Sequence, residues 1–191
     1  MATETLRPTA TRPLTYVDIL ETPVGESNRY EIIAGEMFVS ASPSKRHAWI
    51  STRLFRWIAD YAEQNNLGVV FHAPVDVRLT LHDVVVPDVI FLREERKHLF
   101  GEHFVDGPPD LIVEILSPST RSRDVTAKKR LYAETGVQEY WVVDQVTADV
   151  TVYWRSHKGS YEVISAEDGK VRSRIIPGLE IISDKLLVGL D

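Results

Sequence analysis

The sequence predicts one α/β domain, with a mixed central sheet flanked by helices and a β-rich C-terminal extension. Three observations carry this prediction. Residues 110–144 follow a strand–helix–strand pattern, a second amphipathic helix precedes them, and short alternating strands separated by turns follow residue 150. Residues 1–13 are polar and proline-containing and are expected to form a flexible arm, so the single domain is expected to span 14–191.

Composition limits the class of protein. Of 191 residues, 43% are hydrophobic and 26% charged, as in ordinary soluble domains. Without cysteine, a metal site would need nitrogen or oxygen ligands. The net charge of -6 requires any nucleic-acid contact to come from a local cluster of lysine and arginine. No apolar run is long enough to cross a bilayer and no secretion signal is visible, so a cytoplasmic location is expected.

The first half of the chain predicts a hairpin, a helix and two extended stretches. Residues 29–39 should form the hairpin, turning at Ala34-Gly35. The helix is expected from about 45 to 65, because its apolar residues share one face. Residues 67–81 and 84–92 read as strands, and residues 93–109 as a loop or short helix.

The stretch from Asp110 to Asp144 organises the rest of the chain. Residues 111–116 are apolar on both alternating faces, which predicts a central strand covered on both sides. Glu114 lies within this strand, where an unpaired carboxylate costs several kcal/mol. It therefore needs a cation, a metal or a proton as its partner. A basic helix follows and should end at Gly136 in left-handed conformation.

Asp88 and Glu114 form a candidate pair, because each lies in or beside an otherwise apolar strand. If the strands are neighbours, both carboxylates could bind one divalent cation of the Mg²⁺ type. Such a cation can activate water for attack on a phosphate. The alternative is structural: Asp88 would simply begin a strand, and a helix cation would neutralise Glu114.

Lys128 is the candidate cation for Glu114. Ala127, Leu131 and Thr135 share a helical face, and Lys128 lies on the edge of that face, from where it could reach over the sheet. The alternative is a surface pair between Asp124 and Lys128, worth only a few tenths of a kcal/mol.

Several segments together resemble the Uma2 family of restriction-endonuclease-like proteins, within the PD-(D/E)XK nuclease superfamily. The resemblance covers nearly the whole chain. Its segments are LTYVDIL, RYEIIAGEMFV, SPSKRHAWIS, FHAPVDVRL, VPDVIFL, DLIVEILSPST, RDVTAKKRLY and GVQEYWVVD. It implies a restriction-endonuclease-like fold and a hydrolase that cuts DNA with Mg²⁺ or Mn²⁺.

The resemblance also implies residue roles. Asp88 and Glu114 match the metal-binding acids, and the main-chain carbonyl of Ile115 would be a further ligand. The chain departs from the superfamily pattern at Leu116, where a strand lysine is expected. Lys128 matches the position to which this family moves that lysine.

Further positions have weaker counterparts. Glu31 matches an additional N-terminal acid that would bind metal or orient the reacting group, and Tyr132 and Gln138 resemble helper residues. His47 is a candidate phosphate contact at a helix start, although a surface or capping histidine is favoured. The basic residues that could line a nucleic-acid groove are Lys45, Arg46, Arg53, Arg121, Arg123 and Lys129. Charged side chains on exposed helix faces are, however, more often only solvated. The four tryptophans are expected in the core or an interface rather than as platforms for stacked bases.

The sequence thus predicts a metal-dependent endonuclease acting on DNA, with Glu31, Asp88, Glu114 and Lys128 at its site. The alternative is a non-catalytic module that keeps the fold and binds protein or nucleic acid. A homodimer is expected, because cutting both strands of a duplex requires two sites and oligomers are commonly two-fold symmetric.

Overall fold

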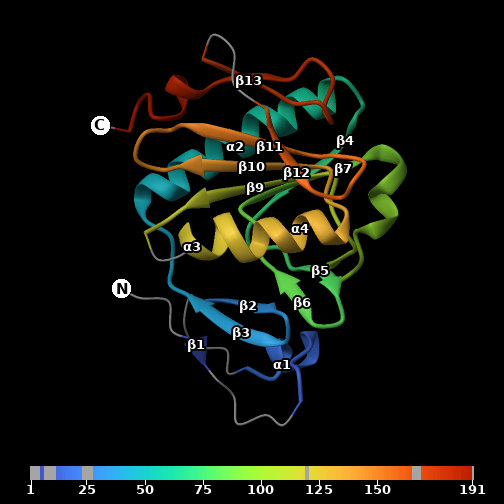
Figure 1. The fold of residues 1–191 in the computed structure, drawn as a ribbon. Coiled ribbons are helices and arrows are strands. Elements are labelled where there is room, and N and C mark those ends of the chain that lie inside the picture. The colour runs from blue at the N-terminus through green and yellow to red at the C-terminus, as the bar shows by residue number, and fades with distance from the viewer. Residues whose placement is uncertain (1–4, 7–11, 23–27, 119–120, 165–168, 191) are drawn as a thin grey trace.

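Two six-stranded sheets and a small two-stranded sheet pack with helices in the part of the chain that is described (Figure 1). The structure is a computed structural model and describes residues 5–6, 12–22, 28–118, 121–164 and 169–190. The predicted fold class, mixed sheets flanked by helices, is confirmed. The single sheet expected from the sequence is instead divided into two large ones.

The central sheet has the strand order β12-β11-β10-β9-β7-β4. Strands β9 and β10 are parallel, and all other neighbours in this sheet are antiparallel. Every residue of β9 is buried, as its apolar sequence predicted. The strands are β4 (Gly68–His72), β7 (Val89–Arg93), β9 (Leu111–Leu116), β10 (Glu139–Asp144), β11 (Val150–Arg155) and β12 (Tyr161–Ile164).

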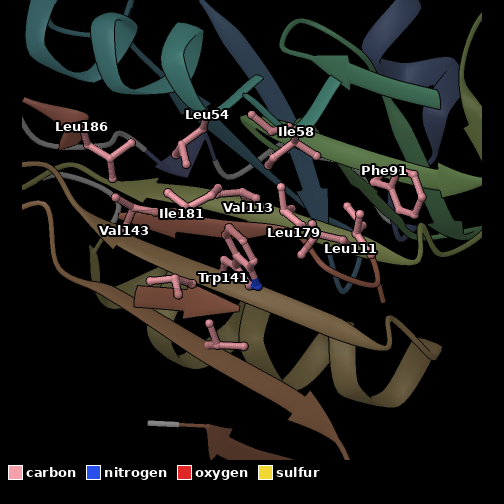
Figure 2. Packing of buried hydrophobic residues seen from close by; sticks show 14 of the residues in the cluster. Leu54, Ile58, Phe91, Leu111, Val113, Trp141, Val143, Leu179, Ile181 and Leu186 are labelled. Carbon is pink, nitrogen blue, oxygen red and sulfur yellow. The ribbon is translucent and has the colours of Figure 1, made fainter. Parts of the chain in front are cut away.

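Both faces of the central sheet are covered. Helix α2 (Lys45–Gln64) packs on one face together with the C-terminal segment, and Leu54, Ile58, Ile181 and Trp141 belong to one hydrophobic cluster there (Figure 2). The prediction of a helix over about 45–65 is confirmed, and Ser44 caps it by accepting a hydrogen bond from the His47 N–H. Helix α4 (Lys129–Thr135) and the second sheet cover the other face.

The second sheet has the order β1-β3-β2-β6-β5-β8 and contains the predicted hairpin. The hairpin turns at Ala34 and Gly35, both with positive φ. Within the expected N-terminal arm, Thr5–Leu6 forms β1 and pairs with β3, while 1–4 and 7–11 lie outside the described residues. The other strands are β2 (Arg29–Ile33), β3 (Glu36–Ser40), β5 (Val77–Thr80), β6 (Asp83–Val85) and β8 (Val105–Asp106).

The prediction of a single strand over residues 84–92 is wrong. Strand β6 ends at Val85 in the second sheet, and β7 begins at Val89 in the central sheet. Pro87 lies between them and has no N–H to continue a ladder, so the chain leaves one sheet and enters the other there. Asp88 therefore lies at the junction of the two sheets. The stretch 67–81 likewise divides, into β4 and β5.

The basic helix after β9 is not a uniform α-helix. A short α3 (Arg121–Arg123) leads into a π-helical turn over Asp124–Lys128 and then into α4, which ends at Gly136 with φ 103 as predicted. The wider π turn rotates the following residues relative to an α-helix. Lys128 and Leu131 are consequently buried, whereas Ala127, which shared the expected face, is exposed.

The C-terminal extension is β-rich, as predicted. Strands β11 and β12 extend the central sheet, and β13 (Lys170–Arg172) pairs with β14 (Glu180–Ile182). The remaining short helices are α1 (Tyr16–Leu20) and 3-10 turns at Glu94–Leu99 and Ser183–Leu186. Among the described residues, no helix has the length and apolar character needed to span a membrane.

Candidate active site

A pocket of about 270 Å³ lies where the two sheets meet the N-terminal end of α2. The loops that follow β9 and β10 complete its wall, through Ser117 and Gln145. Its charged and imidazole side chains come from both sheets and both main helices. They are Arg29, Glu31, His47, Asp88, Glu114, Arg123 and Lys128.

The strand register brings Asp88 and Glu114 together. Strands β7 and β9 are antiparallel neighbours with Val89 opposite Val113, so one step along the register sets Asp88 opposite Glu114. The Ile115 N–H donates to Asp88 Oδ2 at 2.8 Å, which ties the two strands at this point. The expected neighbourhood of the two strands is therefore confirmed.

Asp88 is only 2% exposed and is surrounded by donors. Arg29 Nη1 lies 2.8 Å from Asp88 Oδ1, and His47 Nε2 lies 3.1 Å from Oδ2. Burial alone raises the pKa of Asp88, but the hydrogen bonds and charges of His47 and Arg29 outweigh it and hold the pKa below its ordinary value. Asp88 is therefore an ionised carboxylate at neutral pH.

Glu114 accepts two hydrogen bonds on one oxygen. Lys128 Nζ lies 2.8 Å and Tyr132 Oη lies 2.7 Å from Glu114 Oε1. Burial, followed by the charge of Glu114, raises the pKa of Tyr132 well above its ordinary value. Tyr132 is thus a neutral donor throughout the neutral range, and the cation that Glu114 required is Lys128.

Glu31 is the second partner of Lys128. Its Oε1 lies 2.7 Å from Lys128 Nζ and accepts the Val86 N–H at 2.9 Å, while Oε2 lies 3.1 Å from Arg123 Nη2. Burial raises the pKa of Glu31, but Lys128 and Arg123 more than offset this and hold that pKa below its ordinary value. Glu31 thereby links β2, the chain crossing at Val86 and the basic helix.

Lys128 is 2% exposed and lies between two carboxylates. Lys128 is therefore a buried side chain rather than one on the helix surface, while the side chain of Asp124 lies outside what the structure describes. The π turn that ends at Lys128 sets the direction of its side chain, and such turns often occur at functional sites.

Comparison with known proteins gives a family and a structural neighbour. The model of the Uma2 family, described as "Putative restriction endonuclease", matches residues 15–186. This chain belongs to the Uma2 family. It is 23% identical over 169 residues to "Uncharacterized protein slr1290" of Synechocystis sp., covering 86% of each protein.

The structural neighbour supports the fold of this Uma2 member. It is the crystal structure of "a putative nuclease belonging to DUF820" from Anabaena variabilis. The TM-score is 0.74 at 22% identity, over 91% of this chain and 97% of the neighbour. At that identity the likeness concerns the fold alone.

The structure brings the four principal candidates of this Uma2 member into one pocket: Glu31, Asp88, Glu114 and Lys128. Tyr132 contacts one of them, as a helper residue should. Gln138 does not reach the pocket: it precedes β10, at the opposite end of that strand from Gln145, and its amide donates to the Gly136 carbonyl at 3.2 Å.

The basic candidates do not gather at one place. Arg123 lines the pocket, whereas Arg121 lies outside that lining, paired with Asp144. Lys45 and Arg46 are exposed at the start of α2 and do not line the pocket. Lys129 lies over the Tyr153 ring, with Nζ 4.1 Å from its centroid.

The expectation of a surface or capping role for His47 is wrong. His47 is 6% exposed and contacts Asp88 instead. A signal was available in the sequence, because His47, Ile50 and Leu54 recur at the spacing of one buried helical face.

Arg29 and Gln145 also line the pocket and were not anticipated, although the sequence held a signal for each. Arg29 and Glu31 are two apart on β2 and so share one face of the strand. Gln145 follows β10 as Ser117 follows β9, and the carboxyl ends of parallel strands meet at one edge. Ser44 Oγ donates to Gln145 Oε1 at 3.0 Å.

The metal implied by the family resemblance can be tested against the donors present. Among the described residues, no group of three or more histidine, aspartate or glutamate side chains is placed so that it could hold one metal ion. Mg²⁺ is, however, commonly held by one or two carboxylates, with water completing the shell. Asp88 and Glu114, adjacent in register, fit that donor set. A cation would compete with Arg29, whose side chain is 26% exposed.

Proposed function

We propose that this pocket hydrolyses phosphodiester bonds in DNA with the help of Mg²⁺ or Mn²⁺. One observation carries the proposal: the Lys128 ammonium lies 2.8 Å from Glu114, in the same pocket as Asp88. Two carboxylates can hold a divalent cation that activates water for attack on a phosphate, and a lysine can stabilise the negative charge that develops. The family's description as a restriction endonuclease supports the same class of reaction.

Each residue has a role in this proposal. Asp88, Glu114 and the main-chain carbonyl of Ile115 would hold the cation, which when bound supplies a more acidic water and offsets phosphate charge. Lys128 positions the attacking water and stabilises the negative charge that develops around phosphorus. Tyr132 keeps Glu114 oriented, and Glu31 keeps Lys128 oriented, through the contacts described above.

One observation favours the rival, a non-catalytic module of the same fold. Asp88, Glu114 and Glu31 are balanced within the pocket by three basic side chains, Arg29, Lys128 and Arg123. A closed ion network of this kind can serve as structure alone. The enzyme requires Arg29 to release Asp88 when a cation binds, whereas the rival does not.

The deciding experiment compares cleavage by the wild type with that by Glu114→Gln and Lys128→Met. Single-stranded DNA, double-stranded DNA and RNA are each incubated with Mg²⁺, Mn²⁺ or EDTA. Arg130→Met, at an 80% exposed side chain, is the control. We expect metal-dependent cleavage of DNA by the wild type and the control, reduced at least about a hundredfold in both pocket variants.

Two outcomes would contradict the proposal. Equal cleavage by all variants would place the activity elsewhere or in a contaminant. A wild type that is folded, binds no Mn²⁺ by calorimetry and cuts no substrate would support the non-catalytic module. Sedimentation of the same samples tests the expected homodimer, which two-strand cutting would need.

A further inference from the structure

The outer face of α2 carries a second groove, of about 530 Å³, directed away from the central sheet. Its lining includes three cations, Lys45, Arg53 and Arg56, and two indoles, Trp49 and Trp57. The buried residues of α2, such as Leu54, lie on the opposite side of the helix. Among the described residues, no acidic side chain lines this groove, to which we refer as the α2 groove.

In the described part of the chain, the cations of the α2 groove lack the acidic partners that several other surface cations have. Elsewhere, for example, Arg78 pairs with Asp106 and Lys97 with Glu94. Within the described residues, neither Lys45 nor Arg56 forms an ion pair, and α2 has no acidic residue between positions 45 and 59. In a chain of net charge -6, such a gathering of unpaired cations suits a polyanionic partner.

The position of Lys45 strengthens this argument. It is the first residue of α2, where the helix dipole is already positive and acidic residues are favoured. A cation there is unfavourable for the helix. An anionic partner would turn the same charge into a favourable contact.

Arg53 contacts both indoles at the centre of the α2 groove. Its guanidinium lies over two rings, 5.7 Å from the Trp49 centroid and 5.0 Å from the Trp57 centroid. Its Nη1 also donates to the Val188 carbonyl at 2.7 Å. The two indoles therefore present a fixed apolar surface between the flanking charges of Lys45 and Arg56, which suits the sugars or bases of a nucleic acid.

The α2 groove begins next to the pocket along the chain. It begins at Lys45, and the preceding residue, Ser44, lines the pocket. From Lys45 to Arg56 the helix rises about 16 Å at roughly 1.5 Å per residue. Phosphates follow one strand of a duplex at roughly 3.4 Å along the axis, so this length spans about five of them.

We propose that the α2 groove binds the sugar–phosphate backbone of the DNA whose scissile bond lies in the pocket. This inference rests on the proposed function and adds a track for the substrate outside the reacting centre. Lys45 and Arg56 would contact phosphates, and the indoles would contact sugars or bases between them. An acidic polypeptide is the competing occupant, and the test includes it.

Binding is measured without cleavage, in EDTA, from the fluorescence anisotropy of labelled single- and double-stranded DNA. The variant Lys45→Ala/Arg56→Ala removes two exposed charges, and Arg130→Ala/Lys158→Ala is the control matched in charge and exposure. We expect the groove variant to bind duplex DNA about tenfold or more weakly at roughly 0.1 M salt. We also expect its slope of log K against log salt to fall by about two, against no change in the control.

The outcomes separate this inference from the proposed function. The α2 groove is not the track if the control variant loses as much affinity for DNA as the groove variant does. The same holds if neither variant loses affinity. Binding of polyglutamate, but not DNA, in a manner sensitive to the groove variant would also overturn it. If the groove variant alone binds DNA weakly while wild type cuts nothing, the groove stands and the proposed chemistry falls. If the wild type cuts DNA and the groove variant binds DNA as tightly as the wild type does, the proposed chemistry stands and the α2 groove is not the track.

Discussion

Lys128 Nζ lies 2.7 Å from Glu31 Oε1, and this contact joins a strand of the second sheet to the basic helix on the central sheet. Both side chains are buried, and Glu114 accepts from the same ammonium. One lysine therefore holds two acids that come from different sheets. The stability of the pocket, as well as its proposed chemistry, depends on that cation.

Replacing Lys128 by methionine should destabilise the fold by about 3–5 kcal/mol, because two buried carboxylates lose their shared cation. Urea denaturation in EDTA measures the loss, with Arg130→Met as the exposed control. Adding Glu31→Gln to Lys128→Met should cost less than the sum of the single changes, since it removes one uncompensated charge. A loss below about 1 kcal/mol would contradict the ion network as a stabilising element.

Stability should fall in acid partly because of Glu31. Its pKa lies below the ordinary value of 4.5 in the folded protein, since Lys128 and Arg123 outweigh burial. The unfolded chain therefore takes up the proton first. The stabilising contribution is complete above pH 4.5 and is lost as pH falls through the lower folded pKa.

Glu31→Gln should flatten that part of the pH profile of unfolding free energy. Denaturation curves collected below and above pH 4.5 in EDTA measure it. Glu102→Gln, at an exposed residue, should keep the wild-type slope. Parallel profiles for wild type and Glu31→Gln would show that Glu31 titrates alike in the folded and unfolded states.

Tyr132→Phe should cost about 1–3 kcal/mol, because a buried carboxylate oxygen loses a hydrogen bond of 2.7 Å. Cleavage, if the proposed chemistry holds, should fall while the need for metal remains, since Lys128 still contacts Glu114. Tyr153→Phe changes a half-buried ring without a hydroxyl bond in the described structure and serves as the control. Equal stability of the two variants would argue against a positioning role for Tyr132.

Glu139→Gln should loosen the C-terminal extension. Glu139 is fully buried and accepts hydrogen bonds from Trp141 Nε1 at 2.6 Å and from the N–H groups of Arg174 and Ile175 at 2.7 and 3.0 Å. The NH2 group of a glutamine in its place would face one of these three N–H groups, so that two donors would meet without an acceptor. We expect this to cost about 1–3 kcal/mol.

Hydrogen exchange measures that loosening. Exchange over residues 173–176 should accelerate in Glu139→Gln and remain slow in Glu162→Gln, where the side chain is exposed. Unchanged exchange in that segment would mean that the hydrophobic cluster around Ile176 and Leu179 holds the extension without Glu139.

Much of the local structure could be predicted from the sequence. Apolar runs, turn residues and helical periodicity depend on neighbouring residues only, so they located β9, the hairpin at Ala34-Gly35 and the bounds of α2. Gly136 marked the end of α4 for an equally local reason, its left-handed conformation. The position of Glu114 within an apolar strand correctly predicted that its carboxylate has a partner. Lys128 was a candidate for that partner because of its helical position.

Only the tertiary structure decided which elements meet. The crossing at Pro87 assigns β6 and β7 to different sheets, and this places Asp88 beside both Glu114 and the N-terminal end of α2. The π turn decided that Lys128, not Ala127, faces inward. Sheet partners and helix faces depend on packing between residues far apart in the chain, and a single sequence carries no local pattern for such contacts.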